Sequence, residues 1–183
     1  MVNPGLSVRE IRQEDIDPLV HYWLSADDAF LIAMGVDLAK MPTRDEFVAM
    51  LTEQLNTPLR EKKSYCIIWL LDGVAVGHSN VNKIVFGEEA YMHLHMWNGG
   101  TRQQGLGTKF VKLTLPYFFG NLELKKLYSE PYAPNAAPNR TLAKAGFDFV
   151  KQHITTPGSL NFEQPVNLWE ITSDKYSLLT HKM

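Results

Sequence analysis

The pattern of apolar and polar positions changes its period several times along the chain, and each change marks a new element. Apolar residues at helical spacing predict a helix over Ile16–Leu24, for which Asp15 is a plausible cap. Another helix is expected to begin after Thr43, because Glu46 three residues later completes a capping box. Its helical spacing continues to about Leu55.

The middle of the chain has the pattern of a sheet. Tyr65–Leu71 is continuously apolar, which predicts a strand that is buried on both faces. Asp72-Gly73 is a two-residue hairpin signal that leads into a strand over Val74–Phe86, with Gly77 as a bulge. Glu89–Trp97 alternates strictly, which predicts a third strand. Its two faces carry Met92, Leu94 and Met96 on one side and Tyr91, His93, His95 and Trp97 on the other.

Helices and strands alternate in the second half of the chain. A helix is expected from Thr108 to about Phe119, where Pro116 should either kink it or end it at Leu115. Gly146 is expected to close a later helix in the left-handed conformation. The other expected elements are strands at Ser7–Arg12, Lys125–Pro131, Phe147–Thr155 and Asn167–Thr172, and a short helix at Pro138–Ala145. The pattern therefore predicts a mixed α/β fold.

Composition limits the classes of protein to consider. The 183 residues suit one domain over 1–183, and 18 basic against 20 acidic residues give a net charge of −2, which argues against a nucleic-acid surface. The longest clean apolar run, Cys66–Leu71, is too short to span a membrane. Residues Met1–Gly5 do not resemble a signal peptide, and the single Cys66 excludes an internal disulfide framework and a thiolate zinc cluster. We therefore expect a cytoplasmic protein without nucleic-acid or membrane partners.

The strongest chemical signal is the glycine-rich stretch Trp97–Lys109, which joins a predicted strand to a predicted helix. The first amides of a helix point outward with positive partial charge, and glycines let a phosphate approach them closely. Arg102 adds a charge and Thr108 a hydroxyl donor, so the stretch fits an anion site, although a plain tight turn is an alternative. A Walker loop and a dinucleotide fingerprint both fail, because Leu106 and Phe110 stand where Lys and Gly are required.

A third phosphate-binding pattern fits this stretch. Arg102-x-x-Gly105-x-Gly107 resembles the acetyl-CoA motif of the GNAT N-acetyltransferase superfamily. The block from Asn135 to Gly146-Phe147 resembles the second signature of that superfamily, and the element order is similar over nearly the whole chain. Within the superfamily the chain looks most like the ribosomal-protein N-terminal acetyltransferases. The resemblance implies a central, twisted, mostly antiparallel sheet with helices on both faces.

The resemblance also implies a binding site for acetyl-CoA. Main-chain groups of Met96 and Trp97 would pair with the pantetheine arm, and the amides of Gln103–Thr108 would hold the pyrophosphate. Asn135 would lie near the thiol, with a helix cap as the alternative, and Asn139 and Arg140 would lie near the nucleotide. The cofactor-binding residues expected are Met96, Trp97, Arg102, Gln103, Gln104, Gly105, Leu106, Gly107, Thr108, Asn135, Asn139 and Arg140.

Direct transfer of an acetyl group to an amine is helped by a general base. The resemblance makes Glu130 the first candidate, because a glutamate stands five residues before the signature asparagine in some members; an ion pair with Lys125, Lys126 or Arg140 is the structural alternative. The next candidates are His93 and His95, which share a strand face and could equally be hydrogen-bonded core histidines. No third ligand stands at a spacing that would make the two histidines a metal site.

One position departs from the family pattern. Leu142 stands where many members place a tyrosine that acts as acid for the leaving thiolate, and Tyr128, Tyr132 or solvent could substitute. The sequence therefore leaves two alternatives to an active N-acetyltransferase. One is a catalytically inactive acyl-CoA-binding sensor or scaffold, and the other is a nucleotide-phosphate binder of a different fold.

The acceptor is expected to be a small-molecule amine or a protein N-terminus. Its site should lie between the N-terminal helical region and the Thr156–Gln164 loop. Asp27, Asp28 and Asp37 could attract a cationic amine there, although solvation of the surface explains them as well. A homodimer is compatible with the sequence.

Overall fold

A seven-stranded sheet organises the chain in the computed structural model, which describes residues 5–97 and 105–180. The strand order is β1-β2-β3-β4-β5-β7-β6. All neighbours are antiparallel except β4 and β5. The strands are β1 Leu6–Glu10, β2 Tyr65–Leu71, β3 Val74–Val85, β4 Glu89–Met96, β5 Lys126–Ser129, β6 Asp148–Thr155 and β7 Gln164–Thr172. This arrangement confirms the expected mixed α/β fold with a mostly antiparallel sheet.

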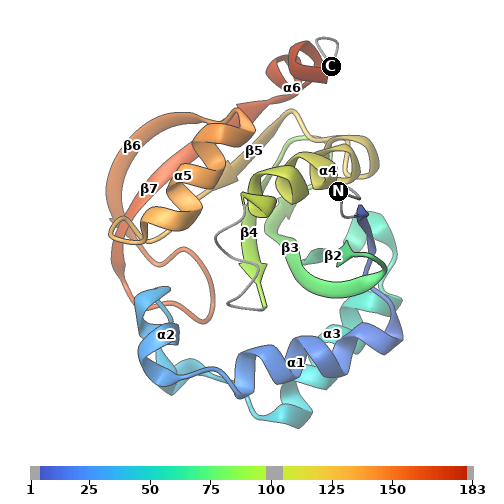
Figure 1. Cartoon of the computed structure of the whole chain (residues 1–183), viewed down its shortest axis with the longest axis vertical. Coiled ribbons are helices and arrows are strands. Elements are labelled where there is room, and N and C mark those ends of the chain that lie inside the picture. Colours follow the sequence, from blue (N-terminus) through green and yellow to red (C-terminus); the bar gives the residue numbers. More distant parts are fainter. Residues whose placement is uncertain (1–4, 98–104, 181–183) are drawn as a thin grey trace.

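Helices cover both faces of the sheet. The α-helices are α1 Ile16–Leu24, α2 Asp28–Ala33, α3 Arg44–Asn56, α4 Leu106–Asn121, α5 Ala136–Ala145 and α6 Ser173–Thr180, and short 3₁₀ turns lie at Gln13–Asp15, Leu38–Lys40 and Leu59–Glu61. The helices α1, α2 and α3 lie on one side of the molecule and α4 and α5 on the other (Figure 1). Within the part of the chain described, no helix is both long enough and apolar enough to cross a bilayer.

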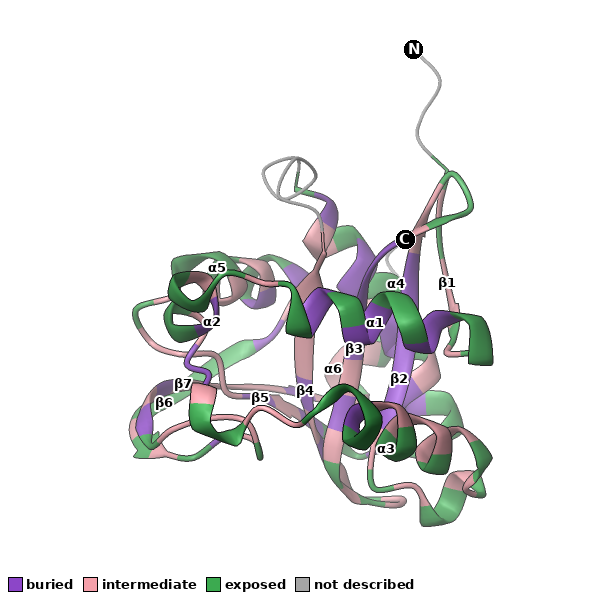
Figure 2. Ribbon diagram, turned by 90° about the horizontal axis from the view of Figure 1, so that it is seen from below, coloured by how far each residue is buried: buried purple, intermediate pink, exposed green. Residues whose placement is uncertain are grey.

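Strand β2 lies between two hydrophobic cores, as its unbroken apolar sequence predicts, and it is largely buried (Figure 2). Tyr65, Ile67 and Trp69 pack into the core under α4, where the Trp69 ring stacks on Phe110 at 5.1 Å between centroids. Cys66 and Ile68 pack into the other core, under α1 and α3. Burial raises the pKa of the Cys66 thiol, so this side chain serves packing rather than nucleophilic chemistry.

The local signals in the first half of the chain are confirmed with one exception. Thr43 and Glu46 form the expected capping box at the start of α3. Asp15 precedes α1 but does not cap it with its side chain. Instead its carboxylate accepts from the Arg12 amide at 2.8 Å and pairs with the Arg9 guanidinium at 2.5 Å. Asp15 therefore ties β1 to the 3₁₀ turn before α1.

The second half departs from the sequence prediction at two helices. Helix α4 continues through Pro116 to Asn121, so the expected end at Leu115 is wrong. Pro116 lies on the exposed face of α4, as does Lys112 one turn earlier, so the carbonyl that loses its helical partner faces water. Buried Leu115 and Phe118 on either side hold the helix to the core. The C-terminal helix α6 had no clear signal and was not expected.

Strands β4 and β5 diverge after a short parallel ladder, and this divergence positions the site. They pair at Glu89–Lys126, Ala90–Leu127 and Tyr91–Tyr128, after which β4 continues to Met96 while β5 ends at Ser129. At the fork the Ser129 hydroxyl donates to the Met92 carbonyl at 2.7 Å. The sheet is therefore open between the far half of β4 and the segment that follows β5.

Candidate active site

Polar side chains gather on one face of β3 and β4, where the sheet would otherwise pack against a helix. The register pairs His78 with His95, Asn80 with His93 and Asn82 with Tyr91. Paired residues in an antiparallel ladder project to the same face, so these polar groups form a continuous floor. Gly77 lets the strands approach, since a Cβ there would lie 2.4 Å from the His95 carbonyl oxygen.

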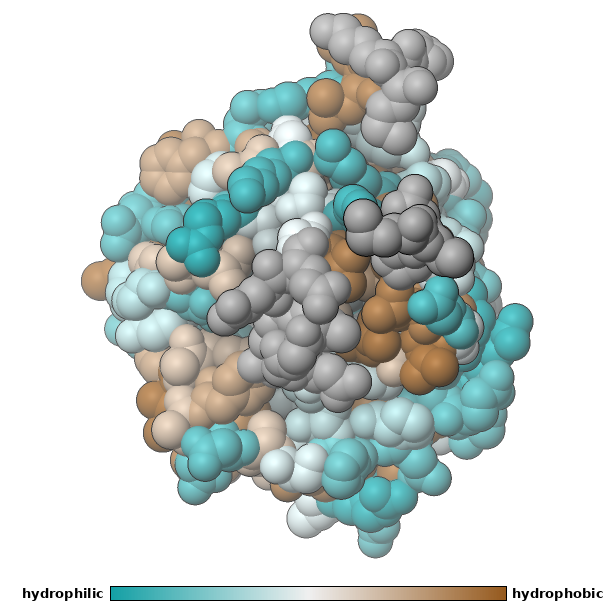
Figure 3. Space-filling view, viewed as in Figure 1, coloured by the Kyte–Doolittle hydropathy of each residue, from teal (hydrophilic) through white to brown (hydrophobic). Residues whose placement is uncertain are grey.

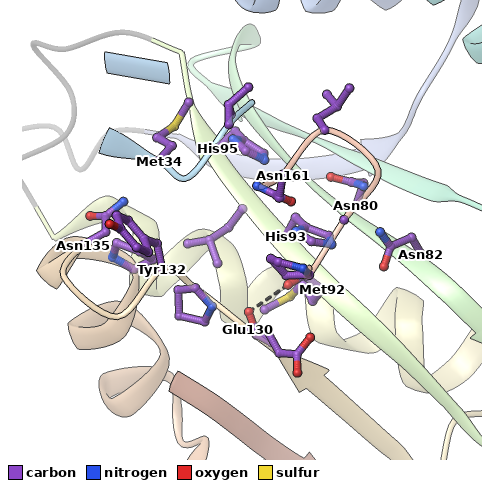
Figure 4. A pocket seen from close by; sticks show the side chains of 18 of the residues that line it. Met34, Asn80, Asn82, Met92, His93, His95, Glu130, Tyr132, Asn135 and Asn161 are labelled. Carbon is purple, nitrogen blue, oxygen red and sulfur yellow. Dashed lines mark hydrogen bonds between the residues drawn. The ribbon is translucent and has the colours of Figure 1, made fainter. Parts of the chain in front are cut away.

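A loop and two helices enclose one end of this floor as a pocket. The β6–β7 loop closes over it: a Cβ at Gly158 would lie 2.8 Å from Asn161 Oδ1 and 3.6 Å from His93 Cε1. Figure 4 shows Asn80, Asn82 and His93 on one side of the pocket and Tyr132 and Asn135 on the other. The lining residues are Trp23, Met34, Val36, Asn80, Asn82, Met92–His95, Ser129–Tyr132, Asn135, Pro138, 157–161 and Gln164. This is the place expected for the acceptor, between the N-terminal helices and the Thr156–Gln164 loop.

Glu130 lies at the edge of this pocket, directly after β5. Its side chain is only 6% exposed and lies between the side chains of His153 and Lys83. His153 Nε2 is 3.0 Å from Oε1, and Lys83 Nζ is 3.8 Å from Oε2. The lysine partners suggested by the sequence are wrong, because Lys125 pairs with Glu88 and Lys126 with Glu170.

The two histidines of β4 also line the pocket, in different environments. His93 is enclosed by the floor and the loop, and its Nε2 has no hydrogen-bond partner within the described residues. Burial, and to a lesser degree the charge of Lys83, lowers the pKa of His93 to about 4, so its imidazole is neutral at pH 7. His95 Nδ1 lies 3.3 Å from the Tyr22 hydroxyl, and its ring stacks on His78 at 4.8 Å.

Acid is expected to destabilise the protein through these buried imidazoles. Burial lowers the pKa of His78 to about 3 and that of His93 to about 4, whereas both titrate near 6.5 when unfolded. The unfolded chain therefore binds more protons below pH 6.5, and the free energy of unfolding falls as the pH drops from about 6.5 towards 4. Melting temperatures of His93→Gln should fall less steeply over this range than those of the wild type. His21→Gln, an exposed control, should keep the wild-type slope; an unchanged slope in His93→Gln would contradict the assignment.

Main-chain groups of β4 face the opening beyond the fork. The Trp97 amide donates to the Val76 carbonyl at 2.8 Å, and amides alternate sides along a strand. The Leu94 amide and carbonyl therefore point away from β3, towards the gap that opens where β5 no longer pairs with β4. Of Met96 and Trp97, the residues expected to pair with pantetheine through their main chain, Trp97 already uses its amide in the bond to Val76, and Leu94 joins the candidates.

Helix α4 is the next described element after β4 in the chain. Gly105 is its N-cap with φ +69°, a left-handed conformation that suits glycine, and it brings no side chain to cap the following amides. A Cβ at Gly107 would meet Thr141 of α5 at 3.6 Å, so the start of α4 adjoins α5. Leu106 is buried and anchors the turn, and Thr108 lies in the first turn. Arg102, Gln103 and Gln104 lie outside the described residues.

The residues expected from the second signature have separate roles. Asn135 occupies the N-cap position of α5 without a side-chain cap, and it lines the pocket. The Asn139 side chain makes four hydrogen bonds: its Nδ2 donates to the carbonyls of Tyr132 and Asn135, and its Oδ1 accepts from Asn167 Nδ2 and Trp169 Nε1. Its polar atoms thus tie α5 to β7, which leaves no capacity for a nucleotide. Arg140 is exposed, and its contact with the nucleotide stays a prediction.

The acidic residues of the N-terminal region do not form the expected amine-attracting cluster. Asp27 caps α2, accepting from the amides of Ala29 and Phe30, and Asp37 caps the next 3₁₀ turn and pairs with Lys40. Neither lines the pocket, nor does the exposed Asp28. Within residues 5–97 and 105–180, no group of three or more His, Cys, Asp or Glu side chains is arranged to hold a metal.

The structure also shows which tyrosine lies near the pocket and could replace the family tyrosine that Leu142 displaces. Leu142 is fully buried in the core, so this position cannot present an acid to the pocket. Tyr132 lines the pocket, whereas Tyr128 stacks on Tyr91 with centroids 5.1 Å apart and is not among the lining residues. Of the two substitutes that the sequence offered, Tyr132 is the one beside the pocket.

Several lining or supporting residues were missed from the sequence. Lys83 and His153 are far from Glu130 in the chain, and no local pattern links them to it. Asn80 and Asn82 did carry a signal, because polar residues alternating with apolar ones on a central strand indicate a wet cavity rather than a packed face. The surface view shows hydrophilic side chains over much of this face, with one apolar group to the right of the middle and another towards the lower left (Figure 3).

Comparison with known proteins gives consistent findings. Residues 6–148 match the family described as an acetyltransferase (GNAT) domain. The structure of aminoglycoside acetyltransferase AAC(6')-Ib with coenzyme A and kanamycin is similar, with a TM-score of 0.74 and 16% identity over 96% of this chain and 99% of that one. Spermidine N-acetyltransferase from Vibrio cholerae, with CoA and spermine, has a TM-score of 0.76 and 14% identity over 94% and 98% of the two chains. RimL, a ribosomal L7/L12 α-N-protein acetyltransferase crystallised with CoA, has a TM-score of 0.75 and 13% identity over 96% and 98%. No curated protein sequence matches the chain.

Proposed function

The chain belongs to the GNAT acetyltransferase family, and on that premise we propose that it transfers an acetyl group from acetyl-CoA to a primary amine. The observation that carries this proposal is the fork between β4 and β5, together with the start of α4, the next described helix along the chain. An extended ligand with an anionic end can add to β4 as a strand and place its phosphates at the helix start. The pocket that holds Glu130, His93 and His95 opens at the same fork.

The residues of this chain fit such a ligand. Leu94 presents main-chain groups to the opening, and Gly105 and Gly107 leave space above the first amides of α4, where no atom approaches a Cβ at Gly105 within 4 Å. Bound there, acetyl-CoA supplies an acyl group activated as a thioester. The residues proposed to hold it are Leu94, Met96, Trp97, Arg102, Gln103, Gln104, Gly105, Leu106, Gly107, Thr108, Asn135 and Arg140.

The protein contributes positioning, a proton acceptor and a hydrogen-bond donor. Holding the amine against the acyl carbon supplies about 7–11 kcal/mol through proximity. Glu130 accepts the proton that the amine loses, directly or through a water, and a base of this kind contributes roughly 10²–10⁴-fold. The Leu94 amide is placed to donate to the oxygen on which negative charge develops. His93 and His95 are the alternative bases.

The second candidate function is an acyl-CoA-binding module without catalysis. The buried Leu142, where many members of the family have a tyrosine, favours this alternative. Thiol release from acetyl-CoA, measured with a panel of peptides, polyamines, amino sugars and aminoglycosides, separates the two. Release with any amine supports the transferase. Binding of CoA without release across the panel supports the module.

Other expectations belong to the same proposal. We keep one domain over residues 1–183, a cytoplasmic location, and an acceptor that is either a small-molecule amine or a protein N-terminus. The amines named for the similar solved structures are an aminoglycoside, a polyamine and a ribosomal protein. These three acceptors differ in charge, so the charged groups of the pocket can discriminate between them.

A further inference from the structure

Negative charge is scarce in the pocket. The chain has 20 acidic residues, and all of them lie in the described ranges, since segment 98–104 contains Arg102 but no carboxylate. Of these 20, Glu130 alone lines the pocket. A bound cation can therefore find one carboxylate here and no second one.

That one carboxylate already contacts two residues of the chain. Lys83 Nζ lies 3.8 Å from Glu130 Oε2, and His153 Nε2 lies 3.0 Å from Oε1. On the loop side, Lys40 Nζ donates to the Asn161 carbonyl at 2.6 Å and pairs with Asp37 at 3.6 Å, so this ion pair adds no net charge. The pocket and its rim are thus close to neutral, and an ammonium group away from Glu130 would be desolvated without a carboxylate partner.

The rest of the lining is neutral and divides into two parts. Asn80, Asn82 and Asn161 present carboxamides, and Asn82 Oδ1 is buried without a partner within the described residues. The side formed by α1, α2 and the loop is apolar, with Trp23, Met34, Val36 and Leu160. Figure 4 shows Met34 on the opposite side of the pocket from Asn82. A ligand that matches this lining carries amide-like donors and acceptors together with an apolar group.

From this lining, and resting on the proposed transferase function, we infer that the acceptor is the α-amino group of a peptide with an apolar first residue. Such a ligand has one positive charge, which Glu130 can receive, and a neutral amide backbone for the asparagines. Polyamines and aminoglycosides carry further ammonium groups that this pocket leaves unpaired. The site therefore favours an acceptor with a single positive charge over one with several.

Binding tests this inference independently of turnover. Calorimetry on the protein saturated with CoA compares methionyl-alanine amide, a blocked dipeptide with one charge, with spermidine and kanamycin. The dipeptide should bind at least about tenfold more tightly than either polycation, because each unpaired ammonium carries a desolvation cost. Equal or tighter binding of spermidine or kanamycin, or no binding of the dipeptide, overturns the inference. If the dipeptide binds but no thiol is released, the inference stands and the proposed function fails.

A charge-adding variant provides a second, matched test. Asn80→Asp places a carboxylate in the pocket at nearly constant shape, and it should raise the affinity for spermidine relative to the dipeptide by about tenfold. Asn56→Asp adds the same charge on the exposed end of α3 and should leave the ratio unchanged. Lys83→Met removes the exposed cation beside Glu130. Like Asn80→Asp, it should raise the affinity for spermidine relative to that for the dipeptide. Ratios that stay at the wild-type value in both folded pocket variants contradict charge selection.

Discussion

Replacing Glu130 with Gln is expected to lower kcat for amine acetylation at least tenfold, because a general base contributes roughly 10²–10⁴-fold. Gln keeps the size of the side chain and can still accept from His153, so the fold and the pocket should persist. The affinity for CoA should be nearly unchanged, since Glu130 follows the end of β5 and no residue of α4 lines the pocket beside it. The pH profile of kcat should also shift, because the variant lacks the carboxylate proposed to accept the proton of the amine.

Glu163→Gln is the matched control for this experiment. Glu163 is an exposed glutamate next to Gln164, and it does not line the pocket. The same change of charge there should leave kcat and its pH profile at wild-type values. A wild-type rate in Glu130→Gln would transfer the role of base to His93, His95 or water.

The fold could be predicted where local chemistry determines structure. Thr43 and Glu46 satisfy each other within four residues, and Tyr65–Leu71 is apolar on both faces because helices cover both sides. Gly146 ends α5 in the left-handed conformation, as the sequence predicted, and the Phe147 amide donates to the Leu142 carbonyl at 3.1 Å. The end at Leu115 that Pro116 suggested is wrong, because the intrinsic cost of the proline is outweighed by burial of its neighbours and by hydration of the exposed face of α4.

The candidate site could be predicted only in part, because it is assembled from distant strands. Glu130, His93 and His95 were named from a family resemblance and a strand pattern, and the structure brings all three to one pocket. The groups that fix the charge of Glu130 come from β3 and β6, and their approach depends on the sheet order β3-β4-β5-β7-β6. Lys83 has φ +48° at an irregularity in the β3–β4 register, and sequence alone gives no reason to expect that backbone conformation.

Placing an aspartate at Gly107 is expected to weaken CoA binding by roughly ten- to a hundredfold, through repulsion of the phosphates. Position 107 is the second residue of α4, where a negative charge favours the helix dipole, and a Cβ there has ordinary contact with Thr141 at 3.6 Å. The variant should therefore fold, unlike Gly105→Asp, which forces a side chain onto φ +69°.

Gly107→Asn separates charge from bulk in this test, because it has the same size as the aspartate and no charge. Calorimetric titration with CoA should show a much smaller loss for Asn than for Asp, and the difference should shrink as salt is raised, since the repulsion is screened. Equal losses for the two variants would assign the effect to bulk. Wild-type affinity in a folded Gly107→Asp protein would place the phosphates away from the start of α4. That result would also remove the argument that the ligand runs from the β4–β5 fork to this helix.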